Sequence, residues 1–327
     1  MNLTNIKYID LFAGIGGFHQ AMSSFGAQCV FASEWDKDCQ DTYEANYEMR
    51  PYGDITQIEA DEIPPHDIIC AGFPCQAFSI SGKQKGFEDT RGTLFFDVVR
   101  IAKYHKPKVM ILENVKNFEK HDGGKTLSVV KETLQELGYT LFHKVLNASH
   151  FGVPQKRERI FILAFREDLG VSDFTFPSSY GGATTLSEFL LSADETESLV
   201  INREDIILKE KSVIGTDIFG EYPQKPIRVG IVNKGGQGER IYNPLGHAIT
   251  LSAYGGGVGA KTGLYMIDGV IRRLAPRECM RITGFPEDFI LHPNRNVSYR
   301  QFGNSVVVNV LKAIIKELSQ TLTQIKD

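Results

Sequence analysis

The sequence predicts an α/β protein with a doubly wound, mostly parallel sheet and a smaller glycine-rich β domain. Over the first ~180 residues, short apolar segments alternate with longer amphipathic ones, the pattern of strands joined by crossover helices. The following ~100 residues lose this alternation and are rich in glycine. At 327 residues the chain is long enough to form one large domain or two.

The first half of the chain contains the predicted sheet. A strand over 8–12 leads into a glycine turn at 13–17 and then a helix, and a second strand over 29–33 ends at Glu34. The later elements of this half are strands at 67–71, 109–112, 140–146 and 159–165, and a helix at 126–137. That helix stops before Gly138, a residue typical of the position just after a helix.

The pattern breaks near 177–182, where we place a domain boundary. The acidic stretch 193–210 is expected to be a connector or a helix pair, without assignable chemistry. Glycine supplies ten of the 38 residues from 226 to 263, which favours a small, loop-rich β domain. The apolar run at 305–311 continues into a helix that should dock on the first domain. The predicted division is 1–182, 183–275, a hinge at 276–300, and a returning segment at 301–327.

Composition excludes several classes of protein. The chain is 42% hydrophobic and 23% charged, and no apolar run approaches the ~20 residues that span a bilayer. Its first residues have no signal-peptide core. The five cysteines form no close pair of the Cys-x-x-Cys type, which argues against a disulfide framework and against a zinc site. These features predict a cytoplasmic protein without a metal or a membrane.

The net charge of -4 is unevenly distributed. From Pro226 to Arg281 there are eight Lys or Arg residues and three acids, so this segment is +5 and the remainder is -9. Local positive charge determines attraction to phosphate, so a nucleic-acid partner is compatible with this chain. Taken alone, a segment of this charge is more often an ordinary solvated surface than a DNA-binding face.

Two strands end in groups that suit covalent catalysis. The strand at 67–71 runs through Gly72-Phe73-Pro74 into Cys75, and the strand at 109–112 runs into Glu113. Carboxyl ends of parallel strands meet at the edge where open α/β sheets hold ligands. A thiol nucleophile and a carboxyl are therefore expected side by side. The alternatives are a buried apolar thiol and an exposed acid.

A cofactor site is expected near the first glycine turn. Its spacing differs from the dinucleotide fingerprint Gly-x-Gly-x-x-Gly. Glu34 follows the second strand, where an acid accepts hydrogen bonds from ribose hydroxyls, and Trp35 offers a ring for a purine. Asp54 is placed to meet an exocyclic amine, although an aspartate after glycine is often only a turn residue. This set fits S-adenosylmethionine better than NAD.

Five segments in order resemble the motifs of DNA cytosine-5 methyltransferases: 12–17, 72–76, 113–115, 155–159 and 301–306. They span nearly the whole chain. The resemblance implies an S-adenosylmethionine-dependent methyltransferase fold with a target-recognition domain, a bacterial or phage origin and a double-stranded DNA substrate. It also implies a cofactor pocket lined by Phe12, Gly14, Gly16, Gly17, Glu34, Trp35, Asp54, Ile55, Phe73, Pro74, Leu94, Asn304, Ser305 and Val306.

The chemistry follows from the electron-poor cytosine ring. Addition of the Cys75 thiolate at C6 makes C5 nucleophilic, provided that an acid such as Glu113 protonates or hydrogen-bonds N3. By resemblance, Arg159 donates to the base O2. Arg157, two residues away on the same predicted strand face, is expected to hold the acid or the DNA backbone. Water or hydroxide is expected to remove the C5 proton.

A base in a duplex must be flipped out before a thiol reaches C6. The polar segment 76–93 is expected to form a lid over it, with Gln237 filling the vacated position and Ser81 meeting it from the other groove. Arg240 is a natural reader of guanine, whereas Lys234, Lys261, Arg228 and Arg272 are expected to contact phosphate. By resemblance, the DNA-binding residues are Ser79, Ser81, Lys83, Gln237, Arg240, Thr250, Tyr254 and Gly257.

Resemblance of these loops to one family member implies the site GCGC, with the first C methylated. It also implies a monomer in a restriction–modification system, whose cognate endonuclease, if there is one, acts separately. Three other functions remain open: an RNA cytosine-5 methyltransferase, a non-catalytic DNA-binding relative, and a nicotinamide dehydrogenase. The last would need His247 or His292 as its base, and neither lies in a supporting motif.

Overall fold

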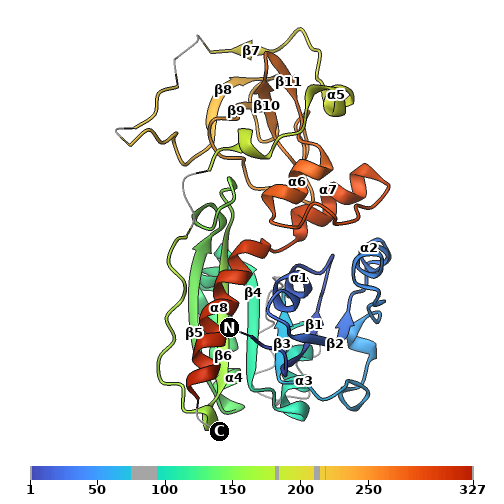
Figure 1. Cartoon of the computed structure of the whole chain (residues 1–327), viewed down its shortest axis with the longest axis vertical. Coiled ribbons are helices and arrows are strands. Elements are labelled where there is room, and N and C mark those ends of the chain that lie inside the picture. The colour runs from blue at the N-terminus through green and yellow to red at the C-terminus, as the bar shows by residue number, and fades with distance from the viewer. Residues whose placement is uncertain (1, 75–93, 181–183, 210–213, 218, 326–327) are drawn as a thin grey trace. The chain divides into compact units, whose positions relative to one another are not determined.

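The computed structural model describes residues 2–74, 94–180, 184–209, 214–217 and 219–325. Contacts divide the chain into two compact units, whose elements are labelled in Figure 1. Unit 1 consists of Met1–Leu146, Glu158–Pro177 and Leu311–Asp327, and unit 2 consists of Asn147–Arg157 and Ser178–Val310. These units reflect packing alone, so the predicted division into catalytic and recognition domains stays a prediction.

Unit 1 contains a six-stranded sheet in the order β2-β1-β3-β4-β6-β5. Its strands are β1 (Lys7–Leu11), β2 (Gln28–Ser33), β3 (Ile68–Ala71), β4 (Val109–Val115), β5 (Tyr139–Asn147) and β6 (Glu158–Arg166). β1 pairs in parallel with β2 and β3, and β3 pairs in parallel with β4. β4 and β6 are antiparallel. The predicted α/β fold with a parallel-rich sheet is confirmed.

Unit 1 contains five α-helices or parts of α-helices among its described residues, and α3 and α4 bury apolar faces in its core. They are α1 (Gly17–Ser23), α2 (Lys37–Tyr47), α3 (Phe95–His105), α4 (Lys125–Glu136) and most of α8 (Val308–Gln324). Side chains of α3 and α4 share one core cluster with Ile9 and Leu11 of β1. Because side chains alternate along a strand, Tyr8 and Asp10 face the opposite side. None of the helices that the structure describes is long and apolar enough to cross a bilayer.

Unit 2 contains a five-stranded sheet in the order β11-β10-β9-β8-β7. Its elements are α5 (Ala193–Thr196), β7 (Ile207–Leu208), β8 (Ile227–Ile231), β9 (Arg240–Asn243), β10 (Leu264–Ile267), β11 (Val270–Arg272), α6 (Pro276–Ile282) and α7 (Arg295–Asn304). β9 and β10 are parallel, whereas the other neighbours are antiparallel. The acidic stretch 193–210 was expected to be a connector or a helix pair, and its described residues form one short α-helix, a 3-10 helix over Glu197–Leu199 and one short strand.

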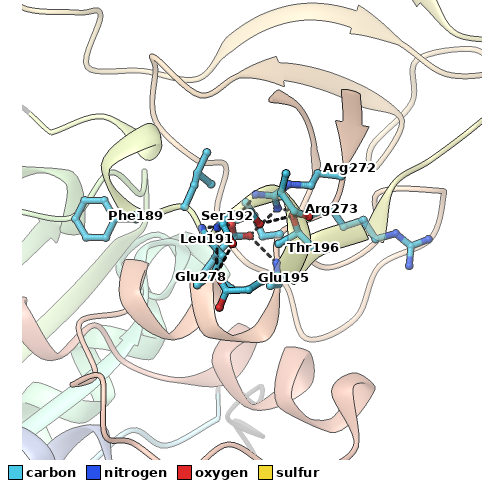
Figure 2. A network of polar contacts seen from close by, with 12 residues as sticks. Phe189, Leu191, Ser192, Glu195, Thr196, Arg272, Arg273 and Glu278 are labelled. Atoms are coloured by element: carbon cyan, nitrogen blue, oxygen red, sulfur yellow. Dashed lines mark hydrogen bonds and ion pairs between the residues drawn. The ribbon is translucent and has the colours of Figure 1, made fainter. Parts of the chain in front are cut away.

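A buried ion pair joins β11 to α6 in unit 2. The guanidinium of Arg272 makes two hydrogen bonds to the Glu278 carboxylate, at 2.8 and 2.7 Å. That carboxylate also accepts the backbone N–H groups of Ala275 and Leu191 (Figure 2). Since Arg272 is only 2% exposed, the prediction that it contacts phosphate is wrong. Its position follows from pairing with an acid six residues away, which the charge count of the segment does not reveal.

Candidate active site

Glu113 and Arg159 form an ion pair at one end of the unit 1 sheet. Glu113 lies on β4 and Arg159 lies on β6. The antiparallel register of these strands pairs Glu113 with Phe161 and Val115 with Arg159. Glu113 and Arg159 therefore project from the same face, and 3.0 Å separates Arg159 Nε from Glu113 Oε1. Their side chains are 11% and 18% exposed. This separation lets one carboxyl and one guanidinium contact neighbouring atoms of a single pyrimidine ring.

Asn114 connects this pair to the segment that leads to the predicted nucleophile. Its buried side-chain amide donates a 2.9 Å hydrogen bond to the Phe73 carbonyl. β3 ends at Ala71, which pairs with Leu112 immediately before Glu113. The chain therefore passes through Phe73 close to β4 as it leaves the sheet. Cys75 itself, with Ser79, Ser81, Lys83 and the rest of the predicted lid, lies outside the described residues.

Arg157 does not share the strand face of Arg159. β6 begins at Glu158, and Arg157 belongs to unit 2. Arg157 is buried, with 2% of its surface exposed. Its guanidinium donates hydrogen bonds to the carbonyls of Leu251, Gly303 and Ser305 at 3.1, 3.0 and 2.8 Å. Arg157 therefore lies one residue before the strand on which it was predicted, and these three hydrogen bonds go to backbone carbonyls of unit 2. Its geometry is that of an arginine that fixes backbone.

The glycine turn between β1 and α1 is held next to Glu34. Phe12, Gly14 and Gly16 have φ values of 55°, 56° and 80°, a region that favours glycine. Glu34 is 7% exposed and accepts backbone N–H groups from Gly14 and Asp36, both at 2.8 Å. Burial raises the pKa of the Glu34 carboxyl, and these two hydrogen bonds oppose that rise.

The other residues predicted around the cofactor differ in their exposure. Trp35 is 81% exposed, and Asp54 is exposed, with one carboxylate oxygen accepting the Thr56 N–H at 3.0 Å. The Phe73 side chain packs against Phe95 and Phe118 in the core, so its backbone alone is available to a ligand. Four further residues of the predicted cofactor pocket lie in unit 1: Gly17 and Ile55 are buried, Leu94 is half-buried and Pro74 is exposed. The last three, Asn304, Ser305 and Val306, belong to unit 2.

Most of the described residues predicted to contact DNA are exposed in unit 2. Gln237, Arg240, Thr250 and Tyr254 are all exposed, Tyr254 at 78%. The Thr250 hydroxyl donates to the Lys156 carbonyl, which leaves its oxygen as an acceptor. Lys234 and Arg228, predicted to contact phosphate, are also exposed.

Unit 2 has two glycine-rich segments, 235–238 and 255–259, and the backbones of these segments are in direct contact. The N–H of Gly259 donates to the Gly238 carbonyl at 2.7 Å. A Cβ atom on Gly238 would lie 2.3 Å from the Gly256 carbonyl oxygen, and Gly238 and Gly257 have φ values of 79° and 87°. Only residues without side chains permit this approach. The segment that carries Gln237 and the segment that carries Tyr254 therefore form one structural feature.

Comparison with known proteins decides the family. The family model described as C-5 cytosine-specific DNA methylase matches residues 6–320. The chain belongs to this family. It is a DNA (cytosine-5)-methyltransferase, and the resemblance seen in the sequence is confirmed.

Members of the family align along nearly the whole chain. Type II methyltransferase M.HhaI of Haemophilus parahaemolyticus is 54% identical over 98% of this chain and 96% of its own length. M.HpaII of Haemophilus parainfluenzae is 41% identical over 98% of this chain and 91% of its own length. The solved structure of S. pombe Dnmt2 superposes with a TM-score of 0.72 at 21% identity, covering 97% of this chain and 99% of that one. That last likeness shows the fold alone.

Sequence reasoning missed the positions that support this site. Asn114 lies in the segment 113–115, which the resemblance to the family singled out, so the sequence could have indicated its importance. Its hydrogen bond to the Phe73 carbonyl was not predicted. Tyr47 and His19, which pack under the glycine turn, had no signal, because single aromatic residues in polar helices carry no local pattern.

Proposed function

We propose that this enzyme transfers a methyl group from S-adenosylmethionine to C5 of cytosine in duplex DNA, through a covalent adduct between Cys75 and C6. The observation that carries the proposal is the Glu113–Arg159 pair, held next to the strand end that leads to Cys75. A cytosine ring that adds a thiolate at C6 requires a proton donor for N3 and a hydrogen-bond donor for O2. Glu113 supplies the first group and Arg159 the second.

The residues around the glycine turn fit S-adenosylmethionine. The Glu34 carboxylate is held beside the glycine turn as an acceptor for ribose hydroxyls, and the exposed Trp35 ring is available for stacking on adenine. The turn brings backbone close to a ligand without side chains in the way. When bound, the cofactor supplies an electrophilic methyl group on a sulfonium.

The protein's own residues then act in sequence. The Cys75 thiolate adds to C6 while Glu113 donates a proton to N3 and Arg159 donates a hydrogen bond to O2, so electron density moves to C5. C5 takes the methyl group while the electron pair of the broken C–S bond stays on the cofactor's sulfur, and water or hydroxide then removes the proton from C5. The thiolate leaves C6 as the N3 proton returns to the Glu113 carboxylate, and the ring regains its aromaticity.

Access to C6 requires a flipped base. We propose that Gln237 occupies the vacated position, supported by its exposed place in a glycine-rich turn. Arg240 begins β9 beside that turn and is exposed, as a bidentate reader of guanine must be. Likeness to M.HhaI over this segment supports the site GCGC, with methylation of the first C.

The type II names of the relatives support a role beside a restriction endonuclease that acts separately. We propose that the enzyme acts as a monomer. The test of the activity uses labelled S-adenosylmethionine and unmethylated duplex DNA, with modified positions mapped at single-base resolution. Label at the first C of GCGC is expected. Label at a different site would discard the specificity and keep the reaction, whereas label in RNA alone would overturn the DNA substrate.

The adduct has its own test. DNA carrying 5-fluorocytosine at the target position cannot release the group at C5 as a proton, so the enzyme should remain covalently attached. Cys75→Ser should abolish both attachment and turnover while leaving DNA binding in place. Cys39→Ser, which alters a half-buried cysteine of α2, should behave like the unsubstituted enzyme. Attachment of the Cys75→Ser enzyme would remove Cys75 from the role of nucleophile.

A further inference from the structure

Helix α2 holds both sides of the glycine turn. At its amino end, the Gln40 side chain donates to the Glu34 carbonyl at 2.5 Å, and Asp36 caps the helix. At its carboxyl end, the Tyr47 hydroxyl lies 3.0 Å from the Gly16 carbonyl. The two ends of one 11-residue helix therefore contact the acid expected at the ribose and the turn that faces it.

The Gly16 carbonyl is fully used as an acceptor. It accepts the Gln20 N–H at 2.8 Å, as the first bond of α1, and the Tyr47 hydroxyl at 3.0 Å. The carbonyl of Ile15 is a more distant alternative for the same hydroxyl, at 3.4 Å. A Cβ atom on Gly16 would lie 2.2 Å from the Tyr47 ring, so ring and turn are in direct contact. The position of the ring thus limits where the turn can lie.

Aromatic neighbours hold the Tyr47 ring in place. His19 stacks on it with ring centres 4.0 Å apart and planes 14° apart. Tyr43 meets the Tyr47 ring edge-on at 4.7 Å, and its hydroxyl lies 2.6 Å from His19 Nδ1. Tyr43 is fully buried. This arrangement leaves the Tyr47 hydroxyl little freedom to move away from the turn.

We propose that Tyr47 is a positioning residue for the cofactor: its hydroxyl fixes the glycine turn in the conformation that receives S-adenosylmethionine. The inference rests on the proposed cofactor site. It assigns Tyr47 no contact with the reacting atoms, so binding of the cofactor should respond to its loss more than the chemical step does.

The test compares Tyr47→Phe, which removes only the hydroxyl, with Tyr139→Phe. Tyr139 is an equally suitable buried tyrosine in unit 1, whose hydroxyl donates to the Pro107 carbonyl at 2.8 Å. Calorimetry measures the Kd of S-adenosylhomocysteine, and methyl transfer gives KM and kcat. Tyr47→Phe should raise Kd and KM about three- to tenfold, the worth of one net hydrogen bond, and leave kcat within about twofold.

Tyr139→Phe should leave the cofactor Kd unchanged, even though it too loses a buried hydrogen bond. A Tyr47→Phe enzyme that binds S-adenosylhomocysteine as tightly as the unsubstituted enzyme would overturn the inference. An equal weakening in both variants would also overturn it, because the effect would then be one of general stability. Failure of the unsubstituted enzyme to bind S-adenosylhomocysteine would instead overturn the proposed cofactor, and with it the role of Tyr47.

Discussion

At the residue scale, the site depends on side chains whose partners are distant in sequence. Glu113 and Arg159 are 46 positions apart by their numbering, yet 3.0 Å separates their charged groups. The neighbouring pair Lys116–Glu158, at 2.8 Å, is more exposed and sits just outside them. Exposed ion pairs of this kind contribute little to stability. Loss of Glu113 should therefore affect the enzyme far more than loss of Glu158.

Glu113→Gln should lower the rate of methyl transfer by about 10²–10⁴, since the amide cannot give N3 a proton. The matched change Glu158→Gln should leave the rate near that of the unsubstituted enzyme. Single-turnover measurements with saturating DNA and cofactor separate this chemical step from binding. A near-normal rate for Glu113→Gln would exclude Glu113 as the acid.

The half-buried His19 should make stability depend on pH. Burial lowers the pKa of His19 from 6.5 to about 4, so the unfolded chain takes up a proton between these values while the folded chain does not. Stability is therefore fully present above pH 6.5 and falls as the pH drops toward 4, by about 1.4 kcal/mol for each unit of difference. Burial likewise lowers the pKa of His66 to about 4.

Urea denaturation at several pH values checks this dependence. His19→Gln should flatten the loss of stability between pH 6.5 and 4, leaving the share that His66 contributes. Comparison of the two proteins at each pH cancels the contribution of Asp10, whose pKa burial raises well above its usual value. A His19→Gln protein with an unchanged slope would contradict the assignment.

At the element scale, backbone contact between glycine segments and one buried ion pair organise unit 2. The backbone contact fixes the position of the segment that carries Gln237 relative to the segment Gly255–Gly257. The ion pair ties the end of β11 to the start of α6 and to the backbone at Leu191 (Figure 2). Each makes a prediction about a single position.

Gly238→Ala should weaken binding to GCGC duplexes by roughly tenfold or more. Its methyl group would enter the space of the Gly256 carbonyl, and its φ of 79° adds strain for a residue with a side chain. Gly256→Ala is the control, because a Cβ there meets nothing within 4 Å. Fluorescence anisotropy with labelled duplexes measures both. Equal affinities for the two variants would show that the contact does not shape the binding surface.

Glu278→Gln should lower the free energy of unfolding by about 3–5 kcal/mol, because it leaves the buried Arg272 guanidinium without its counter-charge. The pair Arg281–Glu287, in which the Glu287 side chain is 64% exposed, provides the control, and Glu287→Gln should cost about 1 kcal/mol or less. Chemical denaturation of the full chain distinguishes the two. Similar losses in both variants would mean that burial adds nothing to the Arg272 pair.

These elements also show which features sequence can predict. All six strands of unit 1 coincide with apolar runs bounded by turn residues, a local pattern that needs no tertiary information. Helix α2 escaped notice because only Thr42 and Tyr43 of its residues are buried. Arg157 and Arg272 were misplaced for a different reason. Their partners lie on other segments, and neither charge nor spacing reveals whether an arginine will meet water, phosphate or backbone.

At the scale of the whole molecule, charge separates the chain into an acidic majority and a basic segment. The net charge is -4, while 226–281 carries +5. Burial of Arg272 with Glu278 removes one charge of each sign, so the rest of the segment keeps this excess. Binding of DNA should therefore depend strongly on salt despite the negative total.

Arg228→Gln should reduce the slope of log K against log salt by about 0.9, the value for one phosphate contact, and weaken all sequences alike. Lys7→Gln removes the same charge at the start of β1 in unit 1 and should leave the slope unchanged. Titrations between 50 and 200 mM salt, roughly the useful range, measure both. Loss of discrimination at one base would identify Arg228 as a sequence reader instead.

The path of the chain limits how unit 2 could be exchanged between relatives of this protein. The polypeptide passes from one unit to the other after Leu146, Arg157, Pro177 and Val310. A cassette of 178–310 exchanged with a relative would leave behind the strap 147–157, whose Gln155 and Arg157 bind the backbone of Ile282 and Leu251. Successful chimaeras must therefore inherit strap and cassette from the same parent, or evolve the strap anew.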